Sequence, residues 1–286
     1  MIIILSLLAA LSLPDIEIHG HRGARASMPE NTIPAFAFAV ENGADVLEMD
    51  VVATADDILV VHHDLKINAN LCRNRDGSRI EESLWIRSLS FEQVKSFDCG
   101  SSSHPQFPKQ RQIPGTKIPS LMEVFEWVKG SKLAMAGQVK FNIEPKSVPA
   151  DSIRSPSPSS YARLLVDVIH QFEFEKRVII QSFDHRVLRE VKEIQPKILT
   201  SALIAQNYLI DLVRVARIAS ADIISPNAEW ITREQVKTLR AIGLKVIPWT
   251  VNDPEDWRRM ADFDIDGIIT DDPKGLKAFL DSRIQK

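Results

Sequence analysis

Short apolar runs alternate with amphipathic segments along most of the chain. Nine runs rich in Val and Ile predict strands, at residues 16–21, 45–51, 58–62, 139–143, 177–181, 198–204, 222–225, 244–250 and 265–269. Eight segments with apolar residues at helical spacing predict helices, at residues 32–42, 121–129, 161–172, 185–194, 210–219, 233–242, 254–261 and 273–283. Strands that alternate with helices are typical of parallel strands joined by helical crossovers, so the predicted fold class is α/β.

Nine strands are one more than an eight-stranded (β/α)8 TIM barrel needs. Residues 54–57 form a polar, turn-like cluster between two apolar runs. A hairpin about this turn predicts that facing residue numbers sum to about 111. Glu48 then lies across from His63. We therefore expect a TIM barrel whose second strand is extended by a β-hairpin.

Two stretches interrupt the alternation. Residues 66–117 contain few strand or long-helix signals and much Ser, Pro, Gly and charge, so we expect a small inserted subdomain after the hairpin. Residues 147–160 are rich in Pro and Ser, which predicts a mobile loop after a barrel strand.

The first residues are apolar from position 2 to 13, apart from Ser6 and Ser12. A bilayer-spanning helix needs about 20 such residues, whereas the core of a signal peptide needs roughly 7–15. Residues 1–12 are therefore interpreted as a possible signal peptide, and 13–286 as one barrel domain. The protein is periplasmic or secreted if that interpretation holds, and cytoplasmic if the segment is instead a buried strand or helix.

The amino-acid composition excludes further classes of protein. The 286 residues include 44% hydrophobic and 26% charged residues, which excludes a disordered chain. The 35 basic and 38 acidic residues give a net charge of −3, without the basic surplus typical of nucleic-acid binders. Cys72 and Cys99 both lie in the insertion, and the sequence leaves open whether they form a disulfide or remain free thiols.

Candidate chemistry gathers where predicted strands end, which is where barrels of this class carry their active sites. His21 and Arg22 follow the first strand; a histidine transfers protons near neutral pH and an arginine binds phosphate or carboxylate. Glu48 and Asp50 share one face of the second strand. Two neighbouring carboxylates favour a hard divalent cation, Ca²⁺ or Mg²⁺, although each could instead pair with an Arg or Lys across the barrel.

The next strand ends with Glu144 and Lys146 on one face, which predicts a third metal ligand and a second substrate cation, or alternatively a local salt bridge. Trp249 could form an apolar wall for a substrate alcohol, or simply belong to the core. His62 should point away if His63 points inward. The two acids of the TDDP motif at 270–273 are interpreted as structural residues at the start of a helix. The acid of the DG pair at 266–267 is interpreted as a structural residue at the start of a strand.

With these residues placed, the chain resembles the glycerophosphodiester phosphodiesterase family over nearly its whole length, from about residue 18 to 273. The resemblance rests on collinear motifs: HRGA at 21–24, PENT at 29–32, GAD at 43–45, ExD at 48–50, HD at 63–64, IPSL at 118–121, ExK at 144–146, QSFD at 181–184, WTVN at 249–252 and DGIITDxP at 266–273.

The resemblance implies a TIM barrel that hydrolyses glycerophosphodiesters to sn-glycerol 3-phosphate and an alcohol with one divalent cation, a step of lipid and glycerol metabolism. It implies roles for eleven residues: His21 and His63 as acid and base; Glu48, Asp50 and Glu144 as metal ligands; and Arg22, Lys146, Glu30, Asn31, Gln181 and Trp249 around the substrate. The expected partner is this small molecule, with no nucleic acid and no stable membrane span. Oligomeric state is not determined by the sequence.

Two other functions compete with this one. A lysophospholipase D or sphingomyelinase D would share the metal and the histidine pair but would need an apolar groove for acyl chains. A non-catalytic phosphodiester-binding barrel would be expected to lack some of His21, Glu48, Asp50, His63 and Glu144, and all five are present.

Overall fold

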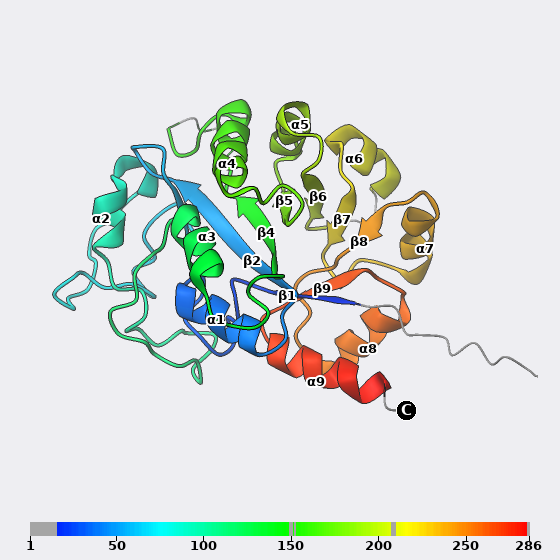
Figure 1. Ribbon diagram of the computed structural model, residues 1–286, viewed down its shortest axis with the longest axis horizontal. Helices are drawn as coiled ribbons and strands as arrows, with labels where there is room; N and C mark the ends of the chain where they lie inside the picture. Colours follow the sequence, from blue (N-terminus) through cyan, green and yellow to red (C-terminus); the bar gives the residue numbers. More distant parts are fainter. Residues whose placement is uncertain (1–15, 149–150, 152, 207–209, 285–286) are drawn as a thin grey trace, which may run out of the picture.

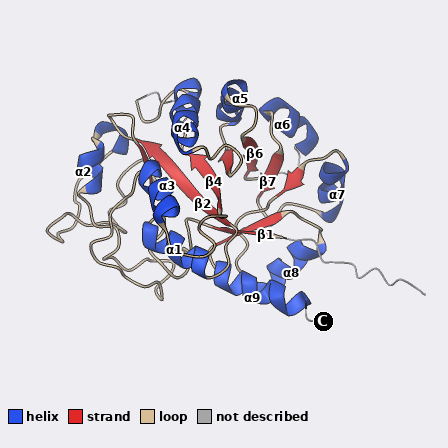
Figure 2. Ribbon diagram, viewed as in Figure 1, coloured by secondary structure: helices blue, strands red, loops and turns tan. Residues whose placement is uncertain are grey.

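The computed structural model describes residues 16–148, 151, 153–206 and 210–284. Parallel strands curve around a common axis and helices cover the outside (Figure 1, Figure 2). The strands are β1 (Glu17–Gly20), β2 (Val46–Ala53), β3 (Leu59–Val61), β4 (Lys140–Pro145), β5 (Val178–Ser182), β6 (Leu199–Ile204), β7 (Ile223–Pro226), β8 (Lys245–Val246) and β9 (Gly267–Thr270). The helices are α1 (Ile33–Glu41), α2 (Phe91–Lys95), α3 (Leu121–Gly130), α4 (Pro158–Phe172), α5 (His185–Ile194), α6 (Leu212–Ala219), α7 (Arg233–Ala241), α8 (Pro254–Asp262) and α9 (Pro273–Ile284), with a 3₁₀ turn, η1 (Ile86–Ser88).

Eight strands form the barrel in the order β8-β7-β6-β5-β4-β2-β1-β9. Backbone hydrogen bonds from Ile269 N to Pro248 O (3.0 Å) and from Val251 N to Ile269 O (2.9 Å) join the two ends of this order. The predicted (β/α)8 barrel is thus confirmed in a nearly closed form. The strand expected over residues 244–250 is only two residues long, although Ile247 N still donates to Ile224 O (3.0 Å) and Trp249 N to Pro226 O (3.0 Å). Pro248 lies toward β9, where it accepts from Ile269 N and has no N–H of its own to donate.

The predicted hairpin is present, but its register differs by one residue from the expectation. β3 pairs antiparallel with β2 through Val51–Val61, Val52–Val60 and Ala53–Leu59, so the numbers sum to 112. The reason lies in the turn, where Thr54 N donates to Ile58 O (2.9 Å) and Asp57 adopts φ 60°. A three-residue loop closed by a left-handed residue fixes this register. The predicted Glu48–His63 pairing was therefore wrong.

The insertion packs around a small core of its own beside the barrel. Its buried side chains include Ile67, Ile80, Ile86 and Val94, which pack against the outer face of the hairpin. Cys72 and Cys99 form a disulfide inside this cluster, which decides between the two states that the sequence left open. The insertion, containing α2, lies at one side of the barrel in Figure 1.

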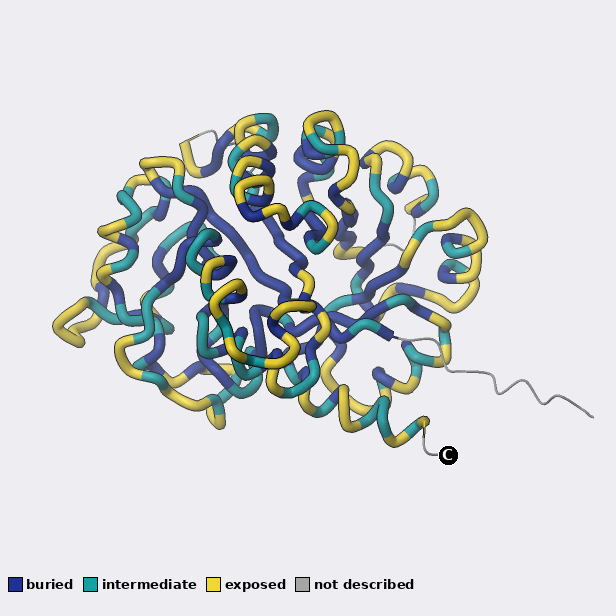
Figure 3. The backbone as a smooth tube through the Cα atoms, in the orientation of Figure 1, coloured by how far each residue is buried: buried dark blue, intermediate teal, exposed yellow. Residues whose placement is uncertain are grey.

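Side-chain alternation separates the barrel lumen from the helical layer. In β2, Leu47, Met49 and Val51 belong to the main core between strands and helices, so Glu48 and Asp50 face the lumen. The strands are buried apart from the first residues of β1, β4, β6 and β8, whereas the helices expose their outer faces (Figure 3). The polar lumen is therefore a consequence of the two-residue period of a strand.

The Pro/Ser-rich stretch ends earlier than expected, because α4 begins at Pro158 rather than after residue 160. Ser157 caps the helix by accepting a hydrogen bond from Ser160 N, and proline is favoured at the first helical position. The possible signal peptide at residues 1–12 lies outside the described residues. Among the described residues, no helix is long and apolar enough to cross a membrane.

Candidate active site

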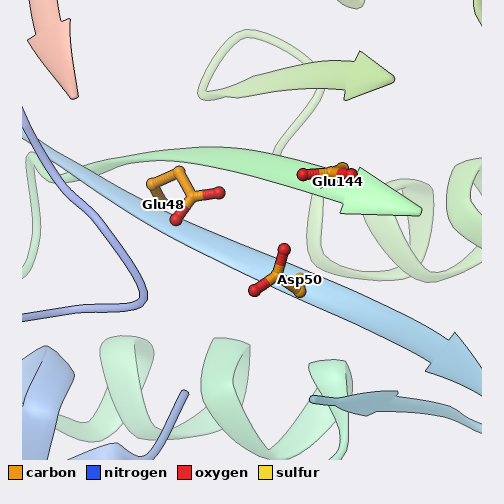
Figure 4. A group of neighbouring side chains, drawn as sticks. All are labelled: Glu48, Asp50 and Glu144. Carbon is orange, nitrogen blue, oxygen red and sulfur yellow. The ribbon is translucent and has the colours of Figure 1, made fainter. Parts of the chain in front are cut away.

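Three buried acids from two adjacent strands form the centre of the candidate site. Parallel pairing places Asp50 of β2 beside Glu144 of β4, and Glu48 precedes Asp50 on the same face (Figure 4). One carboxylate oxygen from each residue lies within 4.8 Å of the others. The sequence predicted that these acids lie close together, and the register of β2 and β4 brings them together.

Two cations lie against these acids. Lys146 Nζ is 2.9 Å from Asp50 Oδ1 and 2.8 Å from Glu144 Oε1. Arg22 donates its backbone N–H to Glu48 Oε2 (2.8 Å), and its Nε is 3.2 Å from Asp50 Oδ2. Lys146 and Arg22, the two residues predicted to bind phosphate, therefore both pair with carboxylates in this structure.

The charges of the cluster are unbalanced. Burial and the neighbouring Asp50 charge raise the pKa of Glu48 well above its ordinary value, and burial also raises the pKa of Glu144. Burial alone would raise the pKa of Asp50 as well, but Lys146 and Arg22 outweigh it and hold that pKa well below its usual range. Two acids with raised pKa values indicate that the present cations do not neutralise the cluster.

The donor set fits a hard divalent cation. Carboxylate oxygens are the ligands that Ca²⁺ and Mg²⁺ prefer, and a bound cation would stabilise the ionised forms that burial disfavours. Glu48, Asp50 and Glu144 could therefore hold a metal.

His21 is oriented by an acid from the last barrel strand. Its Nδ1 lies 2.5 Å from Asp271 Oδ1, and Asp271 in turn accepts from Asn252 Nδ2 (2.8 Å). An ionised carboxylate only accepts, so Nδ1 carries the proton and Nε2 is left with its lone pair. Burial lowers the pKa of His21 below its ordinary value, although Asp271 opposes this shift. The ring is thus neutral at pH 7 and can accept a proton.

His63 has a similar but more exposed arrangement. Its Nδ1 lies 2.8 Å from Asp64 Oδ1, and Asp64 accepts from Asn68 Nδ2 (2.7 Å). The His63 side chain is 36% exposed, against 14% for His21. His62 is buried and contacts the Lys66 carbonyl instead, so it points away as the alternation predicts.

Glu30 and Asn31 act on the site through its other side chains. Glu30 accepts from Arg22 Nη1 (2.6 Å) and from Arg25 Nε (2.5 Å). Burial would raise the pKa of Glu30, but contacts with His104, Arg22 and Arg25 hold it below its ordinary value. Asn31 donates to Asp50 Oδ2 (2.9 Å). Glu30 therefore positions the Arg22 and Arg25 side chains, and Asn31 positions the Asp50 carboxylate.

Two neighbouring cavities open at this end of the barrel. The first, of about 240 Å³, is lined by both histidines and the three acids, together with Arg22, Lys146, Gln181, Phe183 and Trp249. The second, of about 690 Å³, shares His63, Glu144, Lys146 and Phe183 with the first and extends toward the insertion. We call the first the catalytic cavity and the second the outer groove.

Gln181 and Trp249 reach the catalytic cavity from different sides of the barrel. Gln181 donates to Glu48 Oε1 (2.8 Å) and accepts from Asn142 (3.0 Å). Trp249 packs edge-on against Phe183, with ring centroids 5.5 Å apart. His19 is fully buried beneath the site near Asn142 and does not line either cavity.

A barrel mouth that combines a carboxylate cluster, two histidines and two cations defines a hydrolase of phosphoric diesters. The family profile of glycerophosphoryl diester phosphodiesterases matches residues 21–275. The chain therefore belongs to the glycerophosphoryl diester phosphodiesterase family, and it is an enzyme of that class.

Named relatives agree with this assignment. A glycerophosphodiester phosphodiesterase of Caldanaerobacter subterraneus subsp. tengcongensis is 36% identical over 90% of this chain and 94% of its own length. One of Bacillus altitudinis is 30% identical over 90% of this chain and 95% of its own. A crystal structure from Silicibacter pomeroyi, described as a candidate glycerophosphoryl diester phosphodiesterase, has a TM-score of 0.87 at 28% identity and covers 95% of both chains.

The sequence analysis gave no role in the site to Asp271 or Phe183. Asp271 was interpreted as part of a helix start, but Asp272 accepts from Gly275 N (3.0 Å) there, while Asp271 faces His21. The available signal was topological: in a closed barrel, the last strand lies beside the first. Phe183 lies in a recognised motif directly after β5, a position at the active-site end.

Proposed function

We propose that this chain hydrolyses glycerophosphodiesters to sn-glycerol 3-phosphate and an alcohol, with one divalent cation and with His21 and His63 as base and acid. The observation that carries the proposal is the catalytic cavity, because both histidines line it together with the acid cluster and two cations. Its volume of about 240 Å³ suits a phosphoglycerol group.

Glu48, Asp50 and Glu144 would hold the cation, for which Ca²⁺ and Mg²⁺ are the proposed identities. A bound cation would supply positive charge to the phosphoryl oxygens. Once the acids are neutralised in this way, Lys146 and Arg22 become free to bind phosphate oxygens.

The two histidines have different surroundings, and this difference supports their assignment. His21 is held neutral by burial, lines only the catalytic cavity and presents an Nε2 lone pair, so we assign it as the base. His63 lines both cavities and therefore lies where the alcohol would leave toward the outer groove. We assign His63 as the acid that protonates the leaving oxygen.

The nucleophile is either water or the glycerol 2-hydroxyl. In the second case, His21 takes the hydroxyl proton, the oxygen attacks phosphorus and the alcohol leaves with a proton from His63. The resulting cyclic phosphate is then opened by water.

The assignment of His63 is tested with two leaving groups. Replacing His63→Ala should lower turnover of glycerophosphocholine about 10²–10⁴-fold. It should have little effect on p-nitrophenyl glycerophosphate, because p-nitrophenolate leaves without protonation. His21→Ala should slow both substrates. Glycerol 3-phosphate release and p-nitrophenol absorbance measure the rates.

The outcomes separate the roles of the two histidines. If His63→Ala slows both substrates equally, the acid assignment is wrong. If both variants retain full turnover of glycerophosphocholine, the two-histidine mechanism itself is refuted.

A lysophospholipase D activity is the second candidate, because Phe183, Leu203, Trp249 and Ile269 give the catalytic cavity an apolar side. Comparing hydrolysis of glycerophosphocholine and lysophosphatidylcholine distinguishes the two. A faster rate with the lysolipid would favour the second candidate.

A further inference from the structure

The outer groove shares four lining residues with the catalytic cavity and has nearly three times its volume, about 690 Å³ against about 240 Å³. Its lining includes His63 and Lys146 together with residues of the insertion, among them Lys66, Asn70 and Trp85. Under the proposed function, the phosphoryl group lies at the junction of the two cavities. The outer groove is then the space into which the alcohol arm of the substrate extends.

Backbone pairing within the insertion sets the wall of this groove. Lys66 and Trp85 form an antiparallel bridge, supported by hydrogen bonds from Ile67 N to Leu84 O and from Ile86 N to Leu65 O, both 2.9 Å. The flanking side chains Ile67 and Ile86 belong to the insertion core. Lys66 and Trp85 face each other across this bridge, and both line the groove.

Lys66 brings a charge that no acid neutralises. Its ammonium lies over the Trp85 ring, 4.1 Å from the centroid, and no carboxylate is within salt-bridge distance among the described residues. The Arg154 guanidinium also lies 4.1 Å from the same centroid, but it pairs with Asp151 at 2.9 Å. Because Asp151 offsets the charge of Arg154, the attraction of this wall for an anion comes mainly from Lys66.

The carboxylates that line the groove are, in contrast, already paired. Asp64 accepts from His63 and Asn68, and Glu144 pairs with Lys146. Asp184 accepts from Ser147 Oγ (2.7 Å) and from two nitrogens of Arg186, both at 2.8 Å. Lys66 is thus the lining charge that remains available to a ligand among the described residues.

We propose that the outer groove binds the leaving alcohol and that Lys66 gives it a preference for alcohols carrying an anionic group of their own, a phosphate or a carboxylate. This inference rests on the proposed function and names its substrate class. The groove is large enough for such an alcohol, and Asn70 offers an amide for its hydroxyl groups.

A quaternary ammonium alcohol such as choline fits this wall less well. Aromatic faces bind such cations, but Lys66 and Arg154 already occupy the Trp85 ring. A choline group would have to displace one of them and would be repelled by the other. An uncovered Trp85 ring would favour choline, but the ring covered by Lys66 and Arg154 disfavours it.

The test uses two substrates that differ by one group: glycerophosphoglycerol, and the same molecule with a phosphate on its distal hydroxyl. We expect wild-type kcat/KM to be higher for the phosphorylated substrate, and Lys66→Met to lower the ratio of the two values by about tenfold. Lys66→Glu should lower it further. Glycerophosphoglycerate, which carries a carboxylate instead, tells whether the preference is for phosphate or for negative charge in general.

Lys237→Met is the matched control, because Lys237 is exposed on α7, away from the groove. It should leave the ratio unchanged. The wild-type ratio should also fall between about 0.05 M and 0.5 M salt, since screening weakens an exposed charge contact, and this measurement does not depend on how well a variant folds.

The outcomes distinguish the two proposals. If the wild type cleaves neither these substrates nor glycerophosphocholine, the proposed function is wrong and the subsite fails with it; if it cleaves glycerophosphocholine alone, only the anionic subsite is refuted. If it cleaves both but Lys66→Met and Lys66→Glu leave the ratio unchanged, only the anionic subsite is refuted. An equal rate on both substrates at low salt refutes it as well.

Discussion

At the residue scale, the contact that most affects the chemistry is the one between His21 and Asp271. The carboxylate is itself held by Asn252, which donates to Oδ2 (2.8 Å) and accepts from the Asp271 backbone N–H (2.9 Å). This arrangement fixes which nitrogen of His21 carries the proton. It also opposes the effect of burial on the pKa of His21.

We predict that Asp271→Asn moves the pH dependence of catalysis. His21 must be neutral to accept a proton, so kcat/KM rises as pH increases through its pKa. Asp271 stabilises the charged ring, and its loss lowers the pKa further, which moves this rise to lower pH. The maximal rate should fall roughly 10²-fold or more because the ring loses its orientation. A pH profile of kcat/KM measures both effects; a rise displaced to higher pH would contradict the assignment.

At the element scale, the connection from β1 to α1 gives the site its shape. Arg22 and Gly23 both adopt positive φ, 50° and 88°, and Gly23 N donates to the Gly20 and Glu48 carbonyls (3.0 and 3.2 Å). A non-glycine residue in this region is uncommon outside turns and helix ends. The backbone contact from Arg22 to Glu48 Oε2 stabilises it here.

Gly23 is predicted to be intolerant of any side chain. A Cβ there would lie 2.8 Å from Ala35 backbone and side-chain atoms, so Gly23→Ala combines strained φ with a clash. Gly243 has φ 85° and open space around it, so Gly243→Ala isolates the strain, about 1–2 kcal/mol. Gly23→Ala should cost about 1–3 kcal/mol more in urea unfolding and should also lower kcat/KM. Equal losses in the two variants would show that the turn can relax.

At the scale of the whole molecule, barrel closure assembles the site from elements that are distant along the chain. β2 and β4 supply the acids, His21 directly follows β1, and Asp271 directly follows β9, which lies beside β1. The insertion supplies the far wall of the outer groove, and its disulfide lies in the same small core. The expected export of the protein stays a prediction, and a disulfide in the insertion is consistent with it.

Metal binding should be visible in the stability of the entire fold. A cation that binds only the folded state at about 100 times its dissociation constant adds about 2.7 kcal/mol to the unfolding free energy. We expect Ca²⁺ or Mg²⁺ to raise Tm by several degrees, and Glu144→Gln to reduce this rise. Glu126→Gln, on an exposed position of α3, is the control that should retain it. A Tm that does not respond to either ion would contradict the metal site.

Local patterns in the sequence determined the strands, the helices and the face on which Glu48, Asp50 and Glu144 lie, because the two-residue period of a strand is a property of neighbouring residues. The motifs at the strand ends were sufficient to recognise the family and its two histidines.

Only the tertiary structure decided the register of the hairpin, the disulfide and the partner of His21. The register depends on the left-handed conformation of Asp57, which no apolar pattern reports. The Cys72–Cys99 pairing and the His21–Asp271 contact join residues 27 and 250 positions apart, respectively. Such contacts form because the insertion collapses and the barrel closes, and both processes depend on packing across the whole chain rather than on neighbouring residues.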